Sequence, residues 1–361
     1  MKKIKVLQII PSFGVGGAEK VVLNYLKYNC SETMHIKAVS LYPKQNTIYD
    51  TEIENNNYDV VYLHKSRGLD FNVVHELKKL IEEYNPDVIH THLYTLKYLA
   101  LTGKIKNRTI FHTIHSRPDK DAGRIDVLVN KYFFKKGLVT PIALQNRLAV
   151  DVNQYYDINN TKVIRNGISI KDYTKKNASL AKKLGLSQND FVIGHIGRFS
   201  AEKNHEFILN VFQQLLYIKE NAVLLLIGTG SDEEKIKELG IKLKISNKIK
   251  FLGSRVDIPE LLNIMDVFFF PSLYEGLGIV LVEAQAAGVP CLVSTAVPDE
   301  VLLTQKIEKI DLHTPTEMWI DKLVHPEKIY NEKIYEELTK YDISETLLEL
   351  EKLYREKSNY E

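Results

Sequence analysis

Cysteine is scarce in this chain, because its 361 residues include only Cys30 and Cys291. The two lie far apart in the sequence, and neither belongs to a paired motif such as C-x-x-C. This pattern argues against a disulfide framework and against a cysteine metal site. It fits a protein of the reducing cytoplasm.

Long apolar runs are also missing. No stretch approaches the roughly 20 residues that a helix needs to span a bilayer. The N-terminal sequence MKKIKVLQIIPSFG resembles a secretory signal in its lysines and short apolar run, but this run is too short and leads into a glycine-bearing loop. We therefore interpret it as a first strand and its loop, and we expect a cytoplasmic protein.

The net charge is close to zero, at +2, but it is unevenly distributed. Residues 1–165 carry 24 Lys and Arg against 16 Asp and Glu, a net of +8, and the remainder carries 24 against 30, a net of −6. The basic half predicts an anionic partner, either a phosphate-bearing acceptor or the inner face of the cell membrane, to which the protein would bind peripherally. The alternative is that these lysines only solvate the surface. No nucleic acid is expected, because no binding motif and no aromatic ladder accompany the basic residues.

Length and composition predict two folded domains, since 361 residues with 44% hydrophobic content suffice for two cores. Short apolar segments alternate with helical patterns such as 71–84, where apolar residues recur at helical spacing. This alternation predicts a doubly wound α/β sheet in the first half. The segments expected to be strands are 5–10, 36–40, 60–63, 88–91, 109–114 and 138–143.

The segment 269–294 has the order strand, glycine-bearing turn, helix, strand. Glu275 precedes the helix and Glu283 lies within it, with Gly276 and Gly278 where the helix begins. Eight residues of helix advance about 12 Å, so the two glutamates cannot share a proton but could hold opposite ends of one elongated ligand. The alternative is that Glu275 caps the helix and Glu283 is a solvated position.

Two basic residues flank a second loop at the end of a strand. Arg198 and Lys203 lie between a strand that ends at Ile196 and a helix that begins near His205. A guanidinium and an ammonium group beside a helix start suit a diphosphate, to which both form charge-assisted hydrogen bonds. The alternative is a pair of solvated cations.

The glycine-rich loop 11–17 follows the first expected strand. Gly14 and Gly16 match the start of G-x-G-x-x-G, but Glu19 replaces the third glycine, so a dinucleotide cofactor is not predicted. The plain interpretation of this loop is a tight turn from strand to helix.

Four residues suggest a metal site, but their spacing does not support one. His112 and His115 are three apart at the end of a strand, which places them on opposite faces, and we expect His112 to be structural. Asp119 and Asp121 form a D-x-D pattern without supporting context, so we expect a solvated loop there. No metal is predicted.

Six short motifs follow one another along the chain. They are GGAE at 16–19, HTIH at 112–115, RNGI at 165–168, GRFSAEKN at 197–204, LLLIGTG at 224–230 and EGLGIVLVE at 275–283. Their order, and the E-x7-E spacing of the last, resemble the retaining, nucleotide-sugar-dependent glycosyltransferases of the GT-B fold, family 4. The resemblance implies two Rossmann-like α/β domains facing across a cleft. Residues 1–165 would form the acceptor-side domain, residues 166–341 the nucleotide-sugar domain, and a last helix over 342–361 would cross back to the first.

The resemblance implies a role for each matching side chain. Arg198 and Lys203 would bind the donor diphosphate. Glu275 would hold hydroxyls of the donor sugar and Glu283 those of the ribose. His115 would contact the transferred sugar from the other domain, and it joins Glu275 and the two cations as a catalytic candidate.

The same resemblance assigns backbone contacts with the donor. The loop after the first strand would approach a phosphate or the acceptor. The segment near Arg255 and Val256 would contact the nucleotide base. Gly167, at the crossover between the domains, suits a hinge because glycine tolerates unusual backbone angles. The remaining donor-binding candidates are Gly16, Gly17, Arg255, Val256, Gly276, Leu277 and Gly278.

The implied reaction is transfer of a hexose or N-acetylhexosamine from a nucleoside diphosphate, expected to be uridine diphosphate, with retention at the anomeric carbon. The acceptor would be a saccharide or a lipid-linked saccharide in capsule or exopolysaccharide assembly. No cofactor or metal is expected, and the nucleotide-sugar is a substrate. Two alternatives remain: a GT-B sugar-nucleotide epimerase, which would use no acceptor, and a non-catalytic partner subunit.

Overall fold

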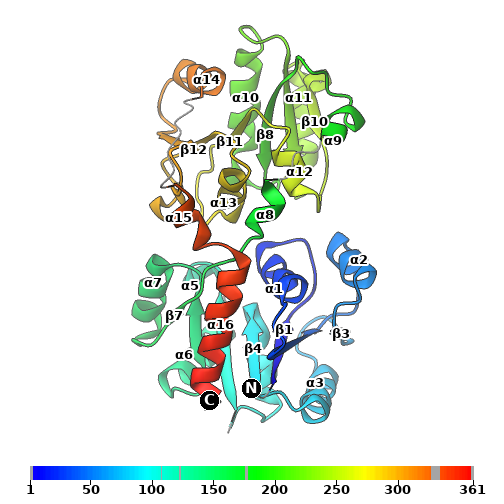
Figure 1. Ribbon diagram of the computed structural model, residues 1–361, viewed down its shortest axis with the longest axis vertical. Helices are drawn as coiled ribbons and strands as arrows, with labels where there is room; N and C mark the ends of the chain where they lie inside the picture. Colours follow the sequence, from blue (N-terminus) through cyan, green and yellow to red (C-terminus); the bar gives the residue numbers. More distant parts are fainter. Residues whose placement is uncertain (1–2, 107, 122, 175–177, 327–333, 359–361) are drawn as a thin grey trace. The chain divides into compact units, whose positions relative to one another are not determined.

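The structure, a computed structural model, describes residues 3–106, 108–121, 123–174, 178–326 and 334–358. The chain forms two compact units (Figure 1). Unit 1 contains Met1–Ile168 and Lys340–Glu361, and unit 2 contains Ser169–Thr339. The sequence-based limits at 165/166 and 341/342 lie within a few residues of these, and residues 359–361 of the predicted last helix lie outside the described residues. None of the described helices combines the length and apolar character needed to cross a bilayer.

Unit 1 is built on a sheet of seven parallel strands in the order β3-β2-β1-β4-β5-β6-β7. The predicted doubly wound sheet is confirmed, with strand ends that shift by one or two residues. The strands are β1 (Ile4–Ile10), β2 (Met34–Ser40), β3 (Val60–Tyr62), β4 (Val88–His92), β5 (Thr109–Ile114), β6 (Thr140–Ala143) and β7 (Lys162–Val163).

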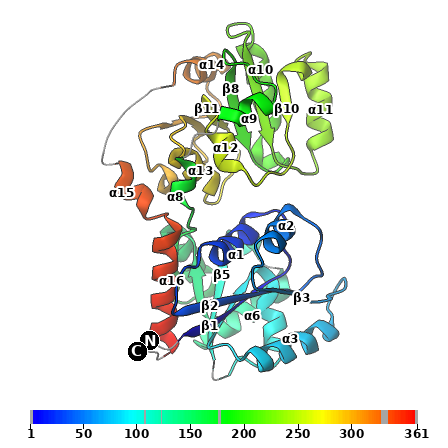
Figure 2. The ribbon, with the colours of Figure 1, turned by 45° about the vertical axis from the view of Figure 1, so that its right-hand side comes forward.

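Helices cover both faces of this sheet, and the alternation of side chains along β1 shows how. Leu7 and Ile9 pack into a core cluster with residues of α3, α4, α6 and α7, whereas Ile4 and Val6 pack with residues of α1 and α16. Figure 2 shows α1 and α16 beside β1 and β2. The helices are α1 (Gly17–Tyr28), α2 (Ile48–Asn55), α3 (Phe71–Tyr84), α4 (Leu96–Leu101), α5 (Pro118–Asp121), α6 (Arg124–Lys135), α7 (Asn146–Tyr156) and α16 (Ile343–Ser358), with one turn of 3-10 helix at η1 (Leu93–Thr95).

The last helix, α16, is part of unit 1 and begins against the end of its sheet. Ile343 N donates a hydrogen bond of 2.9 Å to Ile168 O. Asp342 Oδ1 accepts one of 2.9 Å from Ser344 N, which satisfies an amide of the first turn. The predicted return of the last helix to the first domain is therefore confirmed.

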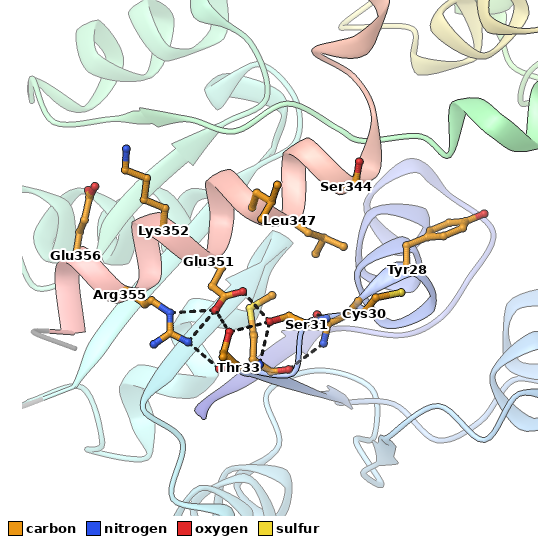
Figure 3. A pocket seen from close by; sticks show the side chains of 13 residues that line it. Tyr28, Cys30, Ser31, Thr33, Ser344, Leu347, Glu351, Lys352, Arg355 and Glu356 are labelled. Atoms are coloured by element: carbon orange, nitrogen blue, oxygen red, sulfur yellow. Dashed lines mark hydrogen bonds and ion pairs between the residues drawn. The ribbon is translucent and has the colours of Figure 1, made fainter. Parts of the chain in front are cut away.

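The other end of α16 is fixed to the start of β2 by polar contacts (Figure 3). Glu351 accepts hydrogen bonds from Ser31 Oγ at 2.8 Å and Thr33 Oγ1 at 2.6 Å, and Arg355 donates to Thr33 O at 2.8 Å. A groove of about 1140 Å³ lies beside these contacts, between the end of α1 and α16. It adjoins the N-terminal end of β2, whereas the predicted ligand residues follow the C-terminal ends of strands.

Gly167 is required at its position for a different reason from the one predicted. It is not among the residues with positive φ, so unusual backbone angles do not explain it. A Cβ there would lie 2.7 Å from Ile343 Cα and 2.6 Å from Thr346 Oγ1. The glycine allows the chain to pass directly against the first turn of α16.

We predict that Gly167→Ala destabilises the protein by about 1–3 kcal/mol, because the added methyl overpacks a contact whose partner is backbone. The urea midpoint of unfolding should fall accordingly. Gly14→Ala is the matched control, since a Cβ there meets its nearest atoms at 3.7 Å. Equal midpoints for the two variants would show that α16 shifts to accommodate the methyl group with little loss of stability.

Unit 2 is built on six parallel strands in the order β10-β9-β8-β11-β12-β13. They are β8 (Phe191–Ile196), β9 (Ala222–Ile227), β10 (Ile249–Phe251), β11 (Val267–Phe270), β12 (Cys291–Ser294) and β13 (Ile307–Ile310). The main helices are α8 (Ile170–Tyr173), α9 (Ala178–Lys183), α10 (His205–Leu215), α11 (Glu233–Lys242), α12 (Ile258–Leu262), α13 (Ile279–Ala286), α14 (Thr316–Val324) and α15 (Ile334–Thr339). The single-turn 3-10 helices are η2 (Ala201–Lys203), η3 (Ser246–Lys248) and η4 (Asp299–Val301).

Candidate active site

The loop that carries Arg198 is held by the turn that follows β9. A Cβ on Gly228 would lie 2.0 Å from Gly197 O, and one on Gly230 would lie 2.2 Å from Phe199 O. Gly228 also has a φ of +134°, which side chains rarely allow. The two glycines therefore let two strand-end loops touch through their backbones, and this contact sets the position of the loop.

Lys203 and Glu275 form an ion pair at the carboxyl ends of the neighbouring strands β8 and β11. Their side chains are only 16% and 12% exposed. Lys203 Nζ also lies 4.8 Å from the centre of the Phe270 ring. Arg198, in contrast, has an exposed side chain. The structure thus brings Lys203 and Glu275 together and leaves Arg198 at the surface of the loop.

Glu275 does not cap the helix that follows it. The N-cap of α13 is Gly278, with a φ of +69°, and no side-chain hydrogen bond caps the helix. Glu275 Oε1 instead accepts a hydrogen bond of 3.1 Å from Gly276 N. Leu277 is half-buried between the two glycines. The capping alternative is therefore wrong, and the amides at the start of α13 carry the partial positive charge of a helix N-terminus.

Glu283 is buried, so the alternative of a solvated helix position is also wrong. It is 8% exposed, and Tyr173 Oη, on α8, donates a hydrogen bond of 2.5 Å to its carboxylate. Tyr173 is itself 5% exposed, and its carbonyl accepts from Asn263 Nδ2 at 2.9 Å. Sequence reasoning missed Tyr173, since no local pattern marks a partner that lies 110 positions from Glu283.

Arg255 pairs with Asp257, at 2.7 Å and 2.5 Å between the guanidinium and the two carboxylate oxygens. The side-chain hydrogen bonds from Arg255 hold the pKa of Asp257 below its usual range. Val256, between them, is 47% exposed. Gly253 O accepts from Gly228 N at 2.9 Å, which ties this segment to the turn after β9.

In unit 1, the glycine loop enters α1 at Gly17. A Cβ on Gly16 would lie 2.5 Å from Glu19 Oε2, so the side chain of Glu19 occupies the space beside Gly16. A Cβ on Gly17 would meet nothing within 4 Å. Of these two glycines, it is thus Gly16 that a neighbouring side chain of unit 1 constrains.

His115 follows β5 directly, and its Nε2 lies 3.0 Å from Nδ1 of His92. Burial lowers the pKa of His115 to about 3, so its imidazole is neutral at physiological pH. His112 is fully buried, with Nδ1 2.9 Å from Thr91 Oγ1. That burial agrees with a structural role for His112.

The expected solvated loop at Asp119 and Asp121 is wrong for one of the two. Asp119 pairs with Arg117 at the surface. Asp121 is enclosed, and it accepts hydrogen bonds of 3.0 Å from the amides of both His115 and Ser116. Burial raises the pKa of Asp121 to about 6. Asp121 therefore fixes the backbone that carries His115. Among the residues that the structure describes, no cluster of three or more His, Cys, Asp or Glu could hold a metal ion.

Two family matches cover both units. Residues 15–172 match the family described as Glycosyltransferase Family 4, and residues 176–302 match Glycosyl transferases group 1. The chain is 25% identical to the capsular polysaccharide biosynthesis glycosyltransferase CapH of Staphylococcus aureus, over 98% of this chain and 99% of CapH. It is 30% identical to the UDP-Gal:alpha-D-GlcNAc-diphosphoundecaprenol alpha-1,3-galactosyltransferase of Escherichia coli, over 60% of each chain.

The fold has a close match among solved structures. Anabaena HepE, solved in complex with UDP-glucose, aligns with a TM-score of 0.79 at 20% identity, over 97% of this chain and 99% of HepE. The fold, with its two parallel-sheet units, is that of the GT-B class. The chain is a glycosyltransferase of the GT-B type, with a glycosyltransferase family 4 domain followed by a group 1 domain, and its relative CapH acts in capsular polysaccharide biosynthesis.

The buried histidines make the stability of the protein depend on pH. In unit 2, His205 is 3% exposed, and neither ring nitrogen has a hydrogen-bond partner within the described residues. Burial lowers its pKa to about 4. Between pH 4 and its ordinary value near 6.5, the unfolded chain binds a proton at His205 that the folded protein does not bind. The contribution of neutral His205 to the free energy of unfolding is therefore fully present above pH 6.5. It decreases as the pH falls below that value.

We predict that His205→Phe removes about 1 kcal/mol of the stability loss between pH 7.5 and pH 5.5, because phenylalanine keeps the stacking on Phe199 and cannot bind a proton. Urea midpoints at the two pH values measure this. His313→Phe, at an exposed position of the same unit, is the control and should leave the pH dependence unchanged. The same pH dependence in the His205 variant as in the wild type would contradict the assignment.

Proposed function

We propose that this glycosyltransferase transfers a hexose or N-acetylhexosamine from a UDP-sugar to a saccharide or lipid-linked acceptor, with retention and without a metal ion, in the assembly of capsular or extracellular polysaccharide. The observation that carries the proposal is the placement of Arg198, Lys203 and Glu275 at the carboxyl ends of two adjacent parallel strands, where open α/β sheets bind ligands. The E. coli relative is a UDP-Gal-dependent galactosyltransferase and Anabaena HepE was solved with UDP-glucose, and both support the choice of nucleotide.

In this proposal each residue acts on one part of the donor. Arg198 and Lys203, with the N-terminus of α13, stabilise the negative charge that grows on the departing diphosphate. Glu275 holds sugar hydroxyls, and Glu283 holds the ribose hydroxyls. His115 contacts the transferred sugar. The segment around Arg255 and the glycine loop at Gly16 and Gly17 are proposed to contact the donor through their backbones.

We predict that Arg198→Ala lowers turnover a hundredfold to a thousandfold, equivalent to about 2.7–4 kcal/mol, because the lost contact strengthens as the glycosidic bond breaks. Lys203→Ala should cost as much in turnover. The double variant should fall short of the product of the two losses, because both residues act on one leaving group. The assay measures turnover in EDTA with a panel of UDP-sugars and lipid-linked acceptors.

The two variants should differ in stability, which separates folding from catalysis. Lys203→Ala leaves Glu275 buried without its cation, so its melting temperature should fall, whereas the exposed Arg198 should be removable without loss. Lys242→Ala, an exposed position on α11, is the control for charge alone. Turnover near the wild-type value in Arg198→Ala, or activity that needs added magnesium or manganese, would contradict the proposal. Conversion of the nucleotide-sugar without an acceptor would favour the epimerase alternative.

The proposal includes reversible binding to an anionic membrane surface through α6. This helix exposes Ile125, Leu128 and Tyr132 at 68%, 69% and 57%, spaced as one stripe on its outer face. Arg124 and Lys131 are exposed on the same helix. An apolar stripe flanked by cations is the pattern of a helix that lies in the headgroup region of anionic lipids.

We predict that the protein sediments with phosphatidylglycerol vesicles at low salt and that high salt weakens this binding, because screening removes the electrostatic part. Leu128→Ser should weaken binding at both salt concentrations, since it removes apolar contact. Ile241→Ser is the matched control, on a residue 66% exposed in unit 2. Binding that does not respond to salt, or no binding, would contradict an electrostatic contact.

A further inference from the structure

A chain of hydrogen bonds inside unit 1 connects the last helix to His115. Each bond joins two side chains that are distant in the sequence, and the chain passes through β5, β4, α16 and β1 before it returns to β4. The links are His90 Nε2 to Thr113 Oγ1 at 2.7 Å, His90 Nδ1 to Tyr354 Oη at 2.5 Å, Gln8 Nε2 to Tyr354 Oη at 3.2 Å, His92 Nε2 to Gln8 Oε1 at 2.8 Å, and His92 Nδ1 to His115 Nε2 at 3.0 Å.

The register of three strands brings these side chains together. In the parallel sheet Gln8 is aligned with His90, and His92 is aligned with Thr113. Alternate positions on a strand share a face, and on this face Val6, Val88 and Phe111 pack against α16. All members except His115 are at most 1% exposed. Polar groups in such a place must satisfy one another, because water does not reach them.

Three of these bonds determine which ring nitrogens of His92 and His115 carry a hydrogen. The amide nitrogen of Gln8 donates to Tyr354, so the Gln8 side chain presents its carbonyl oxygen to His92. A carbonyl oxygen only accepts, and therefore Nε2 of His92 carries the hydrogen. A neutral imidazole has one N–H, so Nδ1 of His92 is an acceptor, and the bond to it must come from Nε2–H of His115.

The rings are neutral, so the chain of bonds determines tautomers and carries no charge. Burial lowers the pKa of both His90 and His92 well below the ordinary value. The two rings also stack, with centroids 4.5 Å apart, an arrangement that two imidazolium ions would oppose.

We propose that this chain of bonds holds His115 in the Nε2–H tautomer and leaves its Nδ1 as a hydrogen-bond acceptor. Tyr354, Gln8 and His92 are positioning residues for His115. The proposal rests on the proposed function in one respect, which is that His115 contacts the transferred sugar. An unprotonated Nδ1 accepts a hydrogen bond from a sugar hydroxyl, and it would repel a phosphate or carboxylate oxygen.

The first test reads the tautomer directly. Two-bond ¹H–¹⁵N correlation spectra of histidine-labelled protein distinguish an Nε2–H ring from an Nδ1–H ring. We expect His115 to show Nε2–H in the wild type, and a mixture of the two in Tyr354→Phe, where Gln8 loses the group that orients its amide. Tyr25→Phe is the matched control: Tyr25 is also buried, and its hydroxyl is not one of the links. An Nδ1–H signal in the wild type, or no change in Tyr354→Phe, overturns the proposal.

The second test uses a pair of variants at His92 and does not depend on Tyr354→Phe being folded. His92→Asn keeps an oxygen near the position of Nδ1, whereas His92→Leu does not. We expect kcat/KM for the UDP-sugar to fall about 2- to 12-fold in His92→Leu, corresponding to a lost hydrogen bond of about 0.5–1.5 kcal/mol, and to recover in His92→Asn. The Kd of UDP alone should stay within a factor of two, since UDP lacks the transferred sugar that His115 is proposed to contact. Equal losses of kcat/KM in both variants would overturn the positioning role.

The two proposals fail in different ways. If His115 shows the Nε2–H tautomer and responds to Tyr354→Phe, but the protein has no transferase activity, the positioning of His115 stands and the proposed reaction is wrong. If the protein transfers sugar and depends fully on Arg198, but His115 carries its hydrogen on Nδ1, the proposed reaction stands and the positioning of His115 is wrong.

Discussion

Unit 1 depends on the packing of its last helix against one face of its sheet. The buried side chains Ile343, Leu350 and Tyr354 of α16 complete a core with residues of β1, β4 and β5. Each such side chain, when fully buried, contributes about 1.5–3 kcal/mol, so the sheet would be poorly covered without a helix that the chain supplies only at its end. The close approach at Gly167 and the polar contacts of Glu351 set where that helix lies. Tyr354 then reaches the buried histidines because α16 lies in this one position.

Most of the fold could be predicted from sequence, because the signals are local. Apolar runs such as Val267–Phe270 mark strands buried on both faces, and glycines such as Gly278 mark the turns between strand and helix. The packing contact that requires a glycine at position 167 could not be predicted, since the contact is with Ile343, which is distant in the sequence. A glycine required for positive φ and one required for close packing look the same in a sequence.

The candidate site could be predicted only in part, for the same physical reason. The residue types at Arg198 and Lys203 indicate a diphosphate, and the spacing of Glu275 and Glu283 indicates an elongated ligand. The sugar and ribose hydroxyls are implied only by the family resemblance. The partners of these side chains could not be predicted from the sequence, because the pairing of Lys203 with Glu275 spans 72 positions and depends on strand order. The order of β1, β4 and β5 likewise decides which side chains meet His92. The burial of Asp121 could not be predicted, because a short acidic segment carries no local sign of burial.

The candidate site residues of the two units are held by different contacts, and this difference bears on the proposed reaction. Unit 1 keeps its imidazoles neutral and arranges their protons. Unit 2 keeps Lys203 and Glu275 charged and pairs them. A diphosphate that takes Lys203 from Glu275 leaves a poorly exposed carboxylate without its cation, which offsets much of the gain. Sugar hydroxyls that reach Glu275 at the same time supply the missing donors. A pair of this kind therefore favours a ligand that carries both a diphosphate and a sugar over either group alone.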